Sequence, residues 1–308
     1  MGDSVVFSII NILHYNMGKG RYIMASIYWY CSLTVIGVIT AIFVMYKKRY
    51  ITEISTFIIF YLFATCITWL CEFTVLGIFN GYAYKPGVFT DPWAENITAH
   101  LLLNSALWPG AALLFAAYSL RYTGITIITI IFILLEYLFE ILGIYEQYWW
   151  NYYMSAILVV VFLVVSKKWF IKMNKIRHGF TRNFTFFMVA MFIIHFPFAI
   201  TLLLGKQYYD VGLVDNVYRS STIFIVIYQF VESLLLMFFV CILKKWYWKL
   251  VPFFIAFIGH GILAYMNILV FQDEWNLFYT FILYTISICV FILLEKYTLK
   301  PQLELIEK

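Results

Sequence analysis

Charged residues are scarce in this chain. Only 12% of its 308 residues are Asp, Glu, Lys or Arg, whereas 64% are hydrophobic. Soluble domains usually contain about 25% charged residues, so this composition is atypical of a soluble protein. The net charge of +5 does not indicate nucleic-acid binding either. The basic residues stand in short clusters between apolar runs, where they indicate membrane topology and contact with lipid head groups.

Motifs for catalysis and metal binding are missing as well. The sequence contains no GxSxG, no P-loop, no glycine-rich dinucleotide turn, no HExxH and no pair of acids spaced to bind a diphosphate. Its cysteines all lie inside apolar runs, where we expect them to act as small hydrophobic side chains: Cys31, Cys66, Cys71, Cys241 and Cys289. No spacing among them suggests zinc. We therefore predict no metal and no cofactor, and no catalytic residue can be assigned from a motif.

Long apolar runs are what the sequence has in abundance. Runs of about 20 residues are typical of membrane-spanning helices, and the alternation of an outer-membrane barrel is absent. We predict an all-α, polytopic membrane helix bundle with spans near 22–46, 54–79, 97–120, 125–145, 149–166, 184–204, 220–243, 250–271 and 276–295. Residues 5–13 form a shorter apolar stretch, without a basic leader or a cleavage site, that suits a short amphipathic helix at the interface.

The basic residues are distributed unevenly between the two sides of this bundle. Sixteen of the 21 follow the first, third, fifth, seventh or ninth span, and the other five are Lys19, Arg21, Lys85, Lys206 and Arg219. Cytoplasmic loops carry the excess of Lys and Arg in most membrane proteins. We therefore predict a multi-pass protein of the cell membrane with its N-terminus outside and its C-terminus in the cytoplasm.

A shift of 125 residues superposes the second to fifth spans on the sixth to ninth without a gap. The shift pairs Tyr84 with Tyr209, Gly87 with Gly212, Asn104 with Gln229, and Trp150-Asn151 with Trp275-Asn276. One hypothesis is an internal repeat, with two parallel four-helix units that both start on the cytoplasmic side, as in some transporters. The alternative is the regular spacing that any helical membrane protein has.

This pattern divides the chain into four parts. Residues 1–50 form an N-terminal segment with the first span, and residues 51–166 form a first four-helix unit. Residues 167–183 form a basic connector, and residues 184–308 form a second four-helix unit with a tail. The connector mixes basic and apolar side chains, which favours a helix lying on anionic lipid.

Polar residues inside the predicted spans are the candidates for function, because they are costly in lipid and usually face the bundle interior. In the first unit the candidate ligand-binding residues are Glu72, His100, Asn104, Glu136 and Glu140. Glu136 and Glu140 are four residues apart and share a helix face. At 1.5 Å per residue, Glu72, His100, Asn104 and Glu140 lie about 5–10 Å below the outer ends of their spans, so we expect them to converge. Neutral acids that bridge helices are the alternative.

The second unit has a different set of polar candidates: Gln229, Glu232, His260 and Asn267. Gln229 and Glu232 are three residues apart on the seventh span, and His260 and Asn267 are seven apart on the eighth. Small residues beside His260 also suit a packing seam between helices. His195, in the sixth span, is a candidate proton carrier or a hydrogen-bonded structural residue.

The loop before the third span is the most distinctive segment. Residues 82–96 read YAYKPGVFTDPWAEN and lead into His100 and Asn104; Pro86-Gly87 and Asp91-Pro92 mark turns. With LGIYE at 142–146 and WNLFY at 275–279, this segment resembles a family of uncharacterised polytopic membrane proteins from spore-forming bacteria. The resemblance implies a bacterial cell membrane. It implies no activity, and no catalytic residue is carried over.

Three functions fit these observations. The first is a non-catalytic protein that binds a small molecule, a lipid or a membrane-protein partner through the polar cluster near the outer surface. The second is a secondary or proton-coupled transporter, which the shift of 125 residues favours. The third is an intramembrane enzyme acting on a lipid-linked substrate, with Glu136 or Glu140 as base and His100 as its partner. The absence of catalytic motifs favours a role other than enzyme.

Overall fold

The computed structural model describes residues 20–243 and 245–299, in which nine helices are long and apolar enough to cross a membrane. These helices are α2 (Gly20–Lys48), α3 (Ile54–Glu72) with its π-helical extension η1 (Phe73–Ile78), α4 (Pro92–Ala117), α5 (Tyr122–Ile141), α6 (Tyr152–Lys175), α7 (Gly179–Leu203), α8 (Val217–Met237) with the π-helical η2 (Phe238–Ile242), the 3-10 turn η3 (Trp246–Leu250) with α9 (Val251–Tyr265), and α10 (Leu277–Tyr297). The prediction of a nine-span bundle is confirmed. The amphipathic helix predicted at 5–13 lies outside the described residues.

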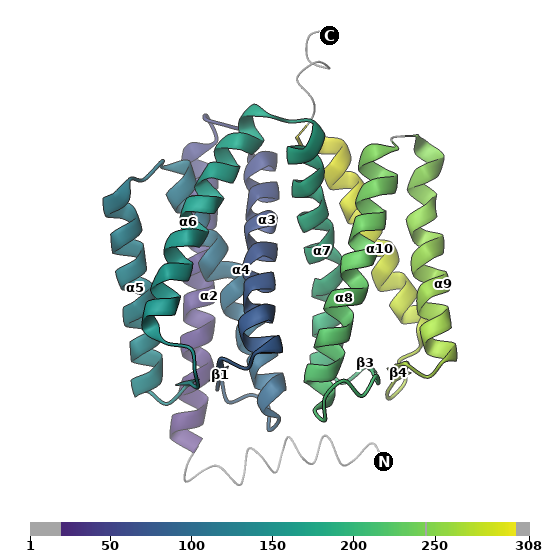
Figure 1. Ribbon diagram of the computed structural model, residues 1–308, viewed down its shortest axis with the longest axis horizontal. Helices are drawn as coiled ribbons and strands as arrows, with labels where there is room; N and C mark the ends of the chain where they lie inside the picture. The colour runs from purple at the N-terminus through teal and green to yellow at the C-terminus, as the bar shows by residue number, and fades with distance from the viewer. Residues whose placement is uncertain (1–19, 244, 300–308) are drawn as a thin grey trace.

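The helices stand side by side, with α2 to α6 in one half and α7 to α10 in the other (Figure 1). Helices α3 and α7 pack against each other between the halves. Their aromatic side chains fill the core together with those of α4 and α6, as at Phe60, Phe63, Phe115, Phe170 and Phe186. We call α3 to α6 the first unit and α7 to α10 the second unit.

Two short antiparallel sheets were not predicted. The fourth and eighth spans end at Ile141 and Tyr265, before the ends expected at 145 and 271. Gly143 and Asn267 follow with φ angles of 70° and 56°, a left-handed conformation that ends a helix. The aromatic and β-branched residues beyond these turns favour extended backbone. They form β2 (Tyr145–Gln147) and β4 (Leu269–Phe271), which pair with β1 (Tyr82–Tyr84) and β3 (Gln207–Tyr209).

We call each of these two-stranded sheets a hairpin, although two helices separate its strands in the sequence, α4 and α5 in the first and α8 and α9 in the second. The two hairpins share several hydrogen bonds. In the first, the backbone N–H of Lys85 donates to the carbonyl oxygen of Ile144 over 2.9 Å; in the second, Asp210 donates to Ile268 over 2.8 Å. The strand residues Tyr84 and Tyr209, 125 positions apart, each donate a backbone N–H to a side chain of the following helix. The acceptors are Asn96 Oδ1 at 2.7 Å and Ser221 Oγ at 2.9 Å, which are also 125 positions apart.

The caps of α4 and α8 join the two units. Asp91 accepts hydrogen bonds from the N–H groups of Trp93 and Ala94, and Asn216 accepts one from Arg219. Such caps satisfy N–H groups that have no partner within the helix. Asn216 Nδ2 also donates to Asp91 Oδ2 over 2.7 Å. Corresponding residues of the two units therefore meet at the hairpin end of the bundle.

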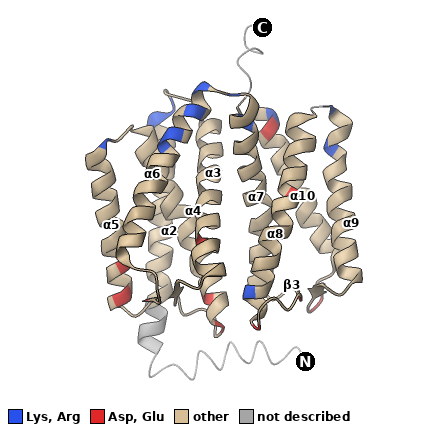
Figure 2. Ribbon diagram, viewed as in Figure 1, with Lys and Arg blue, Asp and Glu red and all other residues tan. Residues whose placement is uncertain are grey.

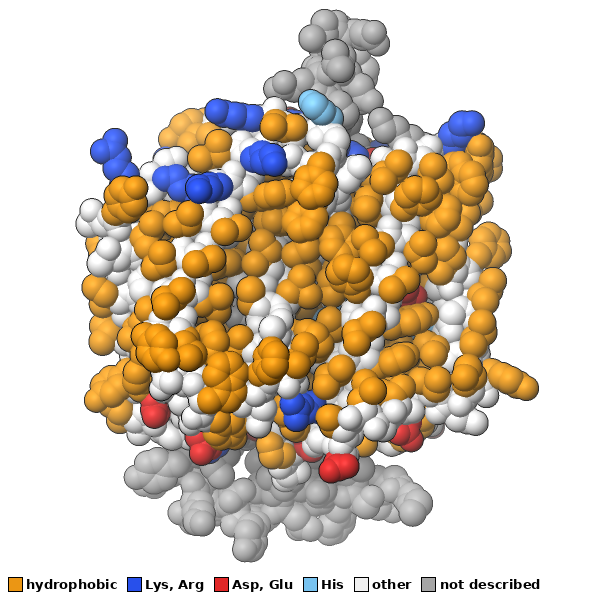
Figure 3. All heavy atoms as spheres, viewed as in Figure 1, with side chains coloured by type: hydrophobic (Ala, Val, Ile, Leu, Met, Phe, Trp, Pro, Cys, Tyr) orange, Lys and Arg blue, Asp and Glu red, His pale blue; other side chains and the backbone are white. Residues whose placement is uncertain are grey.

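Charge separates the two ends of the bundle. Lys and Arg gather at the end where α2, α6 and α10 finish, and acidic residues dominate the end that carries the hairpins (Figure 2). A broad band of hydrophobic side chains lies between them (Figure 3). We call these ends the basic rim and the hairpin rim. At the basic rim α6 continues to Lys175 and α7 begins at Gly179, so the connector is shorter than the predicted 167–183 and forms no separate surface helix.

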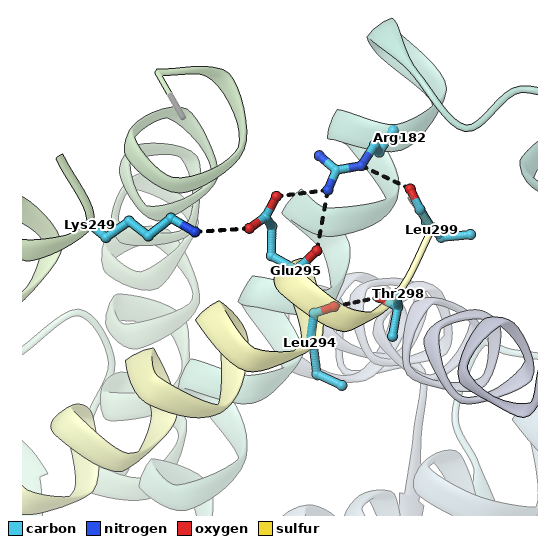
Figure 4. Close-up of polar contacts among 6 residues, drawn as sticks. All are labelled: Arg182, Lys249, Leu294, Glu295, Thr298 and Leu299. Atoms are coloured by element: carbon cyan, nitrogen blue, oxygen red, sulfur yellow. Dashed lines mark hydrogen bonds and ion pairs between the residues drawn. The ribbon is translucent and has the colours of Figure 1, made fainter. Parts of the chain in front are cut away.

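An ion-pair cluster closes the basic rim of the second unit. Arg182 Nη2 lies 2.8 Å from Glu295 Oε1, and Lys249 Nζ lies 3.2 Å from Glu295 Oε2. Arg182 Nε also donates to the carbonyl oxygen of Leu299 over 3.2 Å (Figure 4). Basic side chains of α7 and the 3-10 turn η3 thus converge on one carboxylate of α10, which compensates the burial of Arg182.

Helix α2 packs on α4 through two glycines. A Cβ atom at Gly37 would lie 2.4 Å from the carbonyl carbon of Ala106, and one at Gly110 would lie 2.6 Å from the carbonyl oxygen of Gly37. Contacts this close involve backbone atoms that side-chain movement cannot relieve. Small residues at such seams allow helix backbones to approach in lipid.

We predict that Gly37→Ala lowers the stability of the bundle by about 1–3 kcal/mol, the usual cost of overpacking a well-packed site. The melting temperature of the purified protein in detergent measures this effect. Gly261→Ala is the matched control, because a Cβ atom there meets nothing within 4 Å and alanine favours a helix. Equal melting temperatures for the two variants would contradict the close packing of α2 on α4.

Candidate functional site

A pocket lies between the two units near the hairpin rim. Helices α3, η1 and α4 line one side and α7 and α8 the other, around a volume of about 70 Å³. We call it the inter-unit pocket. Most of its lining is apolar, and its polar or charged side chains include Glu72, Asn96, His100, His195 and Arg219. Apolar walls with a few convergent polar groups are typical of ligand sites.

Trp69 and two histidines form the deep end of this pocket. The Trp69 ring centroid lies 5.0 Å from that of His100 and 5.3 Å from that of His195. Trp69 is only 6% exposed, and its Nε1–H finds no hydrogen-bond partner among the described residues. An indole N–H of a buried tryptophan usually has a partner. This N–H is buried and unpaired in a side chain that lines the pocket.

Hydrogen bonds determine which ring nitrogen of His100 and of His195 carries the proton. Asn104 Nδ2 lies 3.1 Å from His100 Nδ1, and His195 Nδ1 lies 2.7 Å from Gln229 Oε1. With Asn104 donating, the proton of neutral His100 is on Nε2. With Gln229 accepting, the proton of neutral His195 is on Nδ1. The free ring nitrogens are therefore one donor, on His100, and one acceptor, on His195.

Arg219 supplies a positive charge at the hairpin end of the pocket. Its Nε and Nη2 donate to the carbonyl oxygens of Gly77 and Ile78, at 3.0 and 2.9 Å, and its guanidinium stacks 4.6 Å from the Trp93 ring centroid. The acceptors belong to the last turn of η1, where carbonyl groups lack partners within the helix. No carboxylate of the described chain forms an ion pair with Arg219.

A second cavity lies inside the first unit, below the hairpin β1–β2. Its volume is about 90 Å³, and α2, α4, α5 and α6 surround it. Glu136 Oε1 accepts hydrogen bonds from Tyr145 Oη and Gln147 Nε2, both at 3.0 Å. The Glu72 carboxyl group borders this cavity and the inter-unit pocket. Glu72 is 9% exposed, and its Oε1 has no partner among the residues that the structure describes. We call this space the first-unit cavity.

The structure brings three of the five first-unit candidates together and places a fourth in the adjoining cavity. His100 bonds to Asn104, whose side chain faces the Glu72 carboxyl group, and Glu136 enters the first-unit cavity. The expectation was wrong for Glu140, which is exposed and accepts a hydrogen bond from Tyr152. Helix α5 buries only Ile128 and Phe139. Because positions i and i+4 differ by about 40° around a helix, Glu140 falls outside so narrow a buried face.

Three of the four second-unit candidates also gather. His260 Nδ1 lies 3.7 Å from Glu232 Oε1, and Gln229 Nε2 donates to Tyr284 Oη over 3.1 Å. Neither oxygen of Glu232 has a hydrogen-bond partner in the described chain. Asn267 does not join them. It lies in the exposed turn after α9, with a φ of 56°, because that helix ends two residues earlier.

Sequence reasoning missed the two residues that define the inter-unit pocket. Trp69 stands in an unbroken apolar run and looks like an ordinary core residue. Arg219 was counted only as a charge on the poorly basic side. Its position directly before the span predicted at 220–243 was the available signal, because a cation at the start of a helix opposes the helix dipole.

The structure separates the side chains of the acid–base pair proposed from the sequence, and it shows no metal-ligand cluster among the residues that it describes. No group of three His, Cys, Asp or Glu side chains suited to a metal occurs in residues 20–243 and 245–299. His100 faces the inter-unit pocket, and Glu136 faces the first-unit cavity. These two side chains therefore do not serve one reaction centre in this arrangement.

Comparison of the chain with protein-family models, with curated proteins and with solved structures found no match.

Proposed function

We propose that this protein binds the polar end of an anionic amphiphile, such as a lipid or a fatty acid, in the inter-unit pocket. The pocket volume of about 70 Å³ holds only a few atoms, so the rest of the apolar chain lies outside it. The observation that carries the proposal is the unpaired Trp69 N–H at the deep end of an almost wholly apolar pocket. Arg219 adds an unneutralised charge at the hairpin end. An apolar chain suits the walls, and a carboxylate or phosphate suits the guanidinium.

The spacing of these groups constrains the ligand. Arg219 is the third residue of α8, and His195 precedes the end of α7 by eight residues. At 1.5 Å per residue, the charged and deep polar groups are separated by about 10 Å along the membrane normal. The ligand therefore carries an acidic head group at the hairpin rim and a second polar group, such as a hydroxyl or an ester carbonyl, about 10 Å further in.

The π-helical turn η1 supports a binding role for this location. Phe73, Leu76 and Gly77 of η1 line the pocket, and single π-helical turns occur frequently at functional sites. The wider turn leaves the carbonyl groups of Gly77 and Ile78 available to Arg219.

Transport is the second candidate function, because the pocket lies between two units with corresponding hairpins. Substrate sites of many transporters lie at the interface of such repeats. The helix irregularities, however, do not correspond. The π-helical turns follow α3 and α8, and α4 passes through Pro109 and Gly110 without a break. Broken helices at matching places are typical of transporters, so binding is the better supported function.

The architecture supports three further parts of the proposal. The contacts repeated at an interval of 125 residues support duplication of a four-helix unit. The basic rim supports a cytoplasmic C-terminus and contact with anionic lipid there. A bacterial cell membrane is the location that the resemblance to membrane proteins of spore-forming bacteria implies.

Cysteine labelling tests the orientation. In a variant without the native cysteines, we expect Asp210→Cys at the hairpin rim to react with a membrane-impermeant maleimide on intact cells. Lys168→Cys at the basic rim should react only after permeabilisation. Both positions are exposed, so their reactivity toward the reagent differs only because they lie on opposite sides of the membrane. The reverse pattern would contradict the proposed orientation.

A photoactivatable, diazirine-bearing palmitate tests the ligand. We expect it to label peptides of the inter-unit pocket, and we expect Arg219→Gln to reduce this labelling about fivefold, since one basic residue near a membrane surface contributes about 1 kcal/mol to binding an anion. Trp69→Phe, which keeps a ring and removes the N–H, should also reduce it. Peptide mapping by mass spectrometry measures both effects.

The matched control is Arg121→Gln, because Arg121 is an exposed arginine at the basic rim. Its labelling should equal that of the unmodified protein. Labelling spread evenly over the lipid-facing helices, or equal losses in the Arg219 and Arg121 variants, would contradict the proposed site.

A further inference from the structure

We propose that the first-unit cavity binds a small organic ammonium ion, independently of the amphiphile in the inter-unit pocket. The cavity combines two carboxyl groups with a wall of aromatic rings, which is the combination that recognises ammonium groups in proteins.

The charged side chains that line the cavity are all acidic. Glu72 and Glu136 reach it from α3 and α5, and no Lys, Arg or His side chain lines it. Glu136 is held by the Tyr145 hydroxyl and the Gln147 amide. Glu72 Oε1 is buried and forms no hydrogen bond, although the hydroxyl groups of Tyr82 and Tyr84 face the carboxyl group. A buried carboxylate is costly unless it is paired and hydrogen-bonded, so a cation that brings an N–H satisfies the remaining requirement.

Aromatic rings enclose the side of the cavity below the hairpin. The Tyr82 ring centroid lies 5.3 Å from those of Tyr84 and Tyr145 and 6.3 Å from that of Trp150. Tyr84 and Tyr145 lie 5.5 Å apart. The rings are inclined to one another by 40° to 67°, and all four side chains line the cavity. The negative face of an aromatic ring attracts a cation within about 6 Å.

The donor set favours an organic cation over a metal ion. Calcium takes six to eight oxygen ligands and magnesium needs near-octahedral coordination. The cavity offers two carboxyl groups among predominantly hydrocarbon walls. Rings and methylene groups suit an ion that carries its own carbon atoms.

The volume limits the size of this ion. An apolar cavity of about 150 Å³ holds benzene, which corresponds to roughly 25 Å³ for each of its six carbon atoms. By the same ratio, the cavity of about 90 Å³ holds about four non-hydrogen atoms. Trimethylammonium, with one N–H and four non-hydrogen atoms, fits both the volume and the unpaired Glu72 oxygen.

The second unit provides an internal comparison, because Gln207 stands 125 positions after Tyr82. The Gln207 amide is buried and paired within the chain. Its Oε1 accepts from Trp275 Nε1 at 3.2 Å and Thr280 Oγ1 at 2.6 Å, and its Nε2 donates to Thr201 Oγ1 at 2.9 Å. Near the ends of α5 and α9 the two units correspond at an interval of 124, as the pair Ile144 and Ile268 shows. Glu136 therefore corresponds to His260, and the second unit has no carboxylate there. The ammonium site is therefore specific to the first unit.

Calorimetric titration of the purified full-length protein with trimethylammonium chloride, against sodium chloride of equal ionic strength, tests the proposal. We expect saturable binding, weakened at least tenfold by Glu136→Gln and by Glu72→Gln. Glu140→Gln on the same helix is the control, because Glu140 lies outside the cavity; it should leave the affinity unchanged. Tyr82→Phe should keep binding and Tyr82→Leu should weaken it. Melting temperatures establish that each variant is folded.

Two results would overturn the proposal: no binding beyond the sodium chloride control, or equal affinity in the Glu136→Gln and Glu140→Gln variants. Arg219→Gln should not change the affinity for trimethylammonium, which separates this site from the inter-unit pocket. Nanodiscs with and without phosphatidylethanolamine identify the source of the ion. Competition by that lipid indicates a head group as the natural occupant, and lack of competition indicates a free amine.

Discussion

The lack of hydrogen-bond partners in lipid is the constraint on which this structure depends. A polar group within the bilayer is satisfied by the chain itself or remains unpaired at a cost. Most buried polar groups here are satisfied. Arg182 meets Glu295, and Gln229 bonds to His195, Ile194 and Tyr284. The exceptions are therefore informative.

Several of the unpaired groups border cavities. Trp69, whose Nε1 is unpaired, lines the inter-unit pocket. Glu72, whose Oε1 is unpaired, lines both that pocket and the first-unit cavity. Both oxygens of Glu232 are unpaired beside a cavity of about 10 Å³, which is close to the minimum that holds one water molecule. The larger cavities have room for more than water. We infer function from these two places because an unpaired polar group and space for a partner coincide there.

The hairpins position the site. Tyr30 of α2 donates to the Ile144 carbonyl oxygen over 2.6 Å, which ties the leading helix to the first hairpin. The bond between Asp91 and Asn216 holds the first turns of α4 and α8 together. Since α8 carries Arg219 in that turn, the same contact places the guanidinium beside η1. The distance between the cationic and deep polar groups of the pocket thus depends on elements outside the hydrocarbon core.

Much of the fold was predictable from the sequence, because apolar run length and the distribution of basic residues depend on local composition. The number of spans and the residues of α3, α7 and α8 follow from these patterns to within a few positions. The hairpins could not be predicted from these patterns, because Tyr145 and Leu269 continue the apolar runs of the preceding helices. Only the turns at Gly143 and Asn267 separate these strand residues from the helices.

The site was predictable only in part, for a geometric reason. Spacing along one helix groups His100 with Asn104 and Gln229 with Glu232 correctly. It does not determine which way a peripheral helix such as α5 faces, so Glu140 was misplaced. Contacts between helices distant in sequence, such as Trp69 with His195, leave no periodic signal.

A cryo-electron microscopy structure of the protein in nanodiscs of native lipid tests the central claim most directly, because it shows what occupies the inter-unit pocket. Our account predicts elongated density from the Arg219 guanidinium to the Trp69 indole nitrogen, with an acidic group at one end and a polar atom within hydrogen-bond distance of Nε1 at the other. A pocket closed by its own side chains, with Trp69 Nε1 bonded to a protein atom and no density between the units, would contradict it.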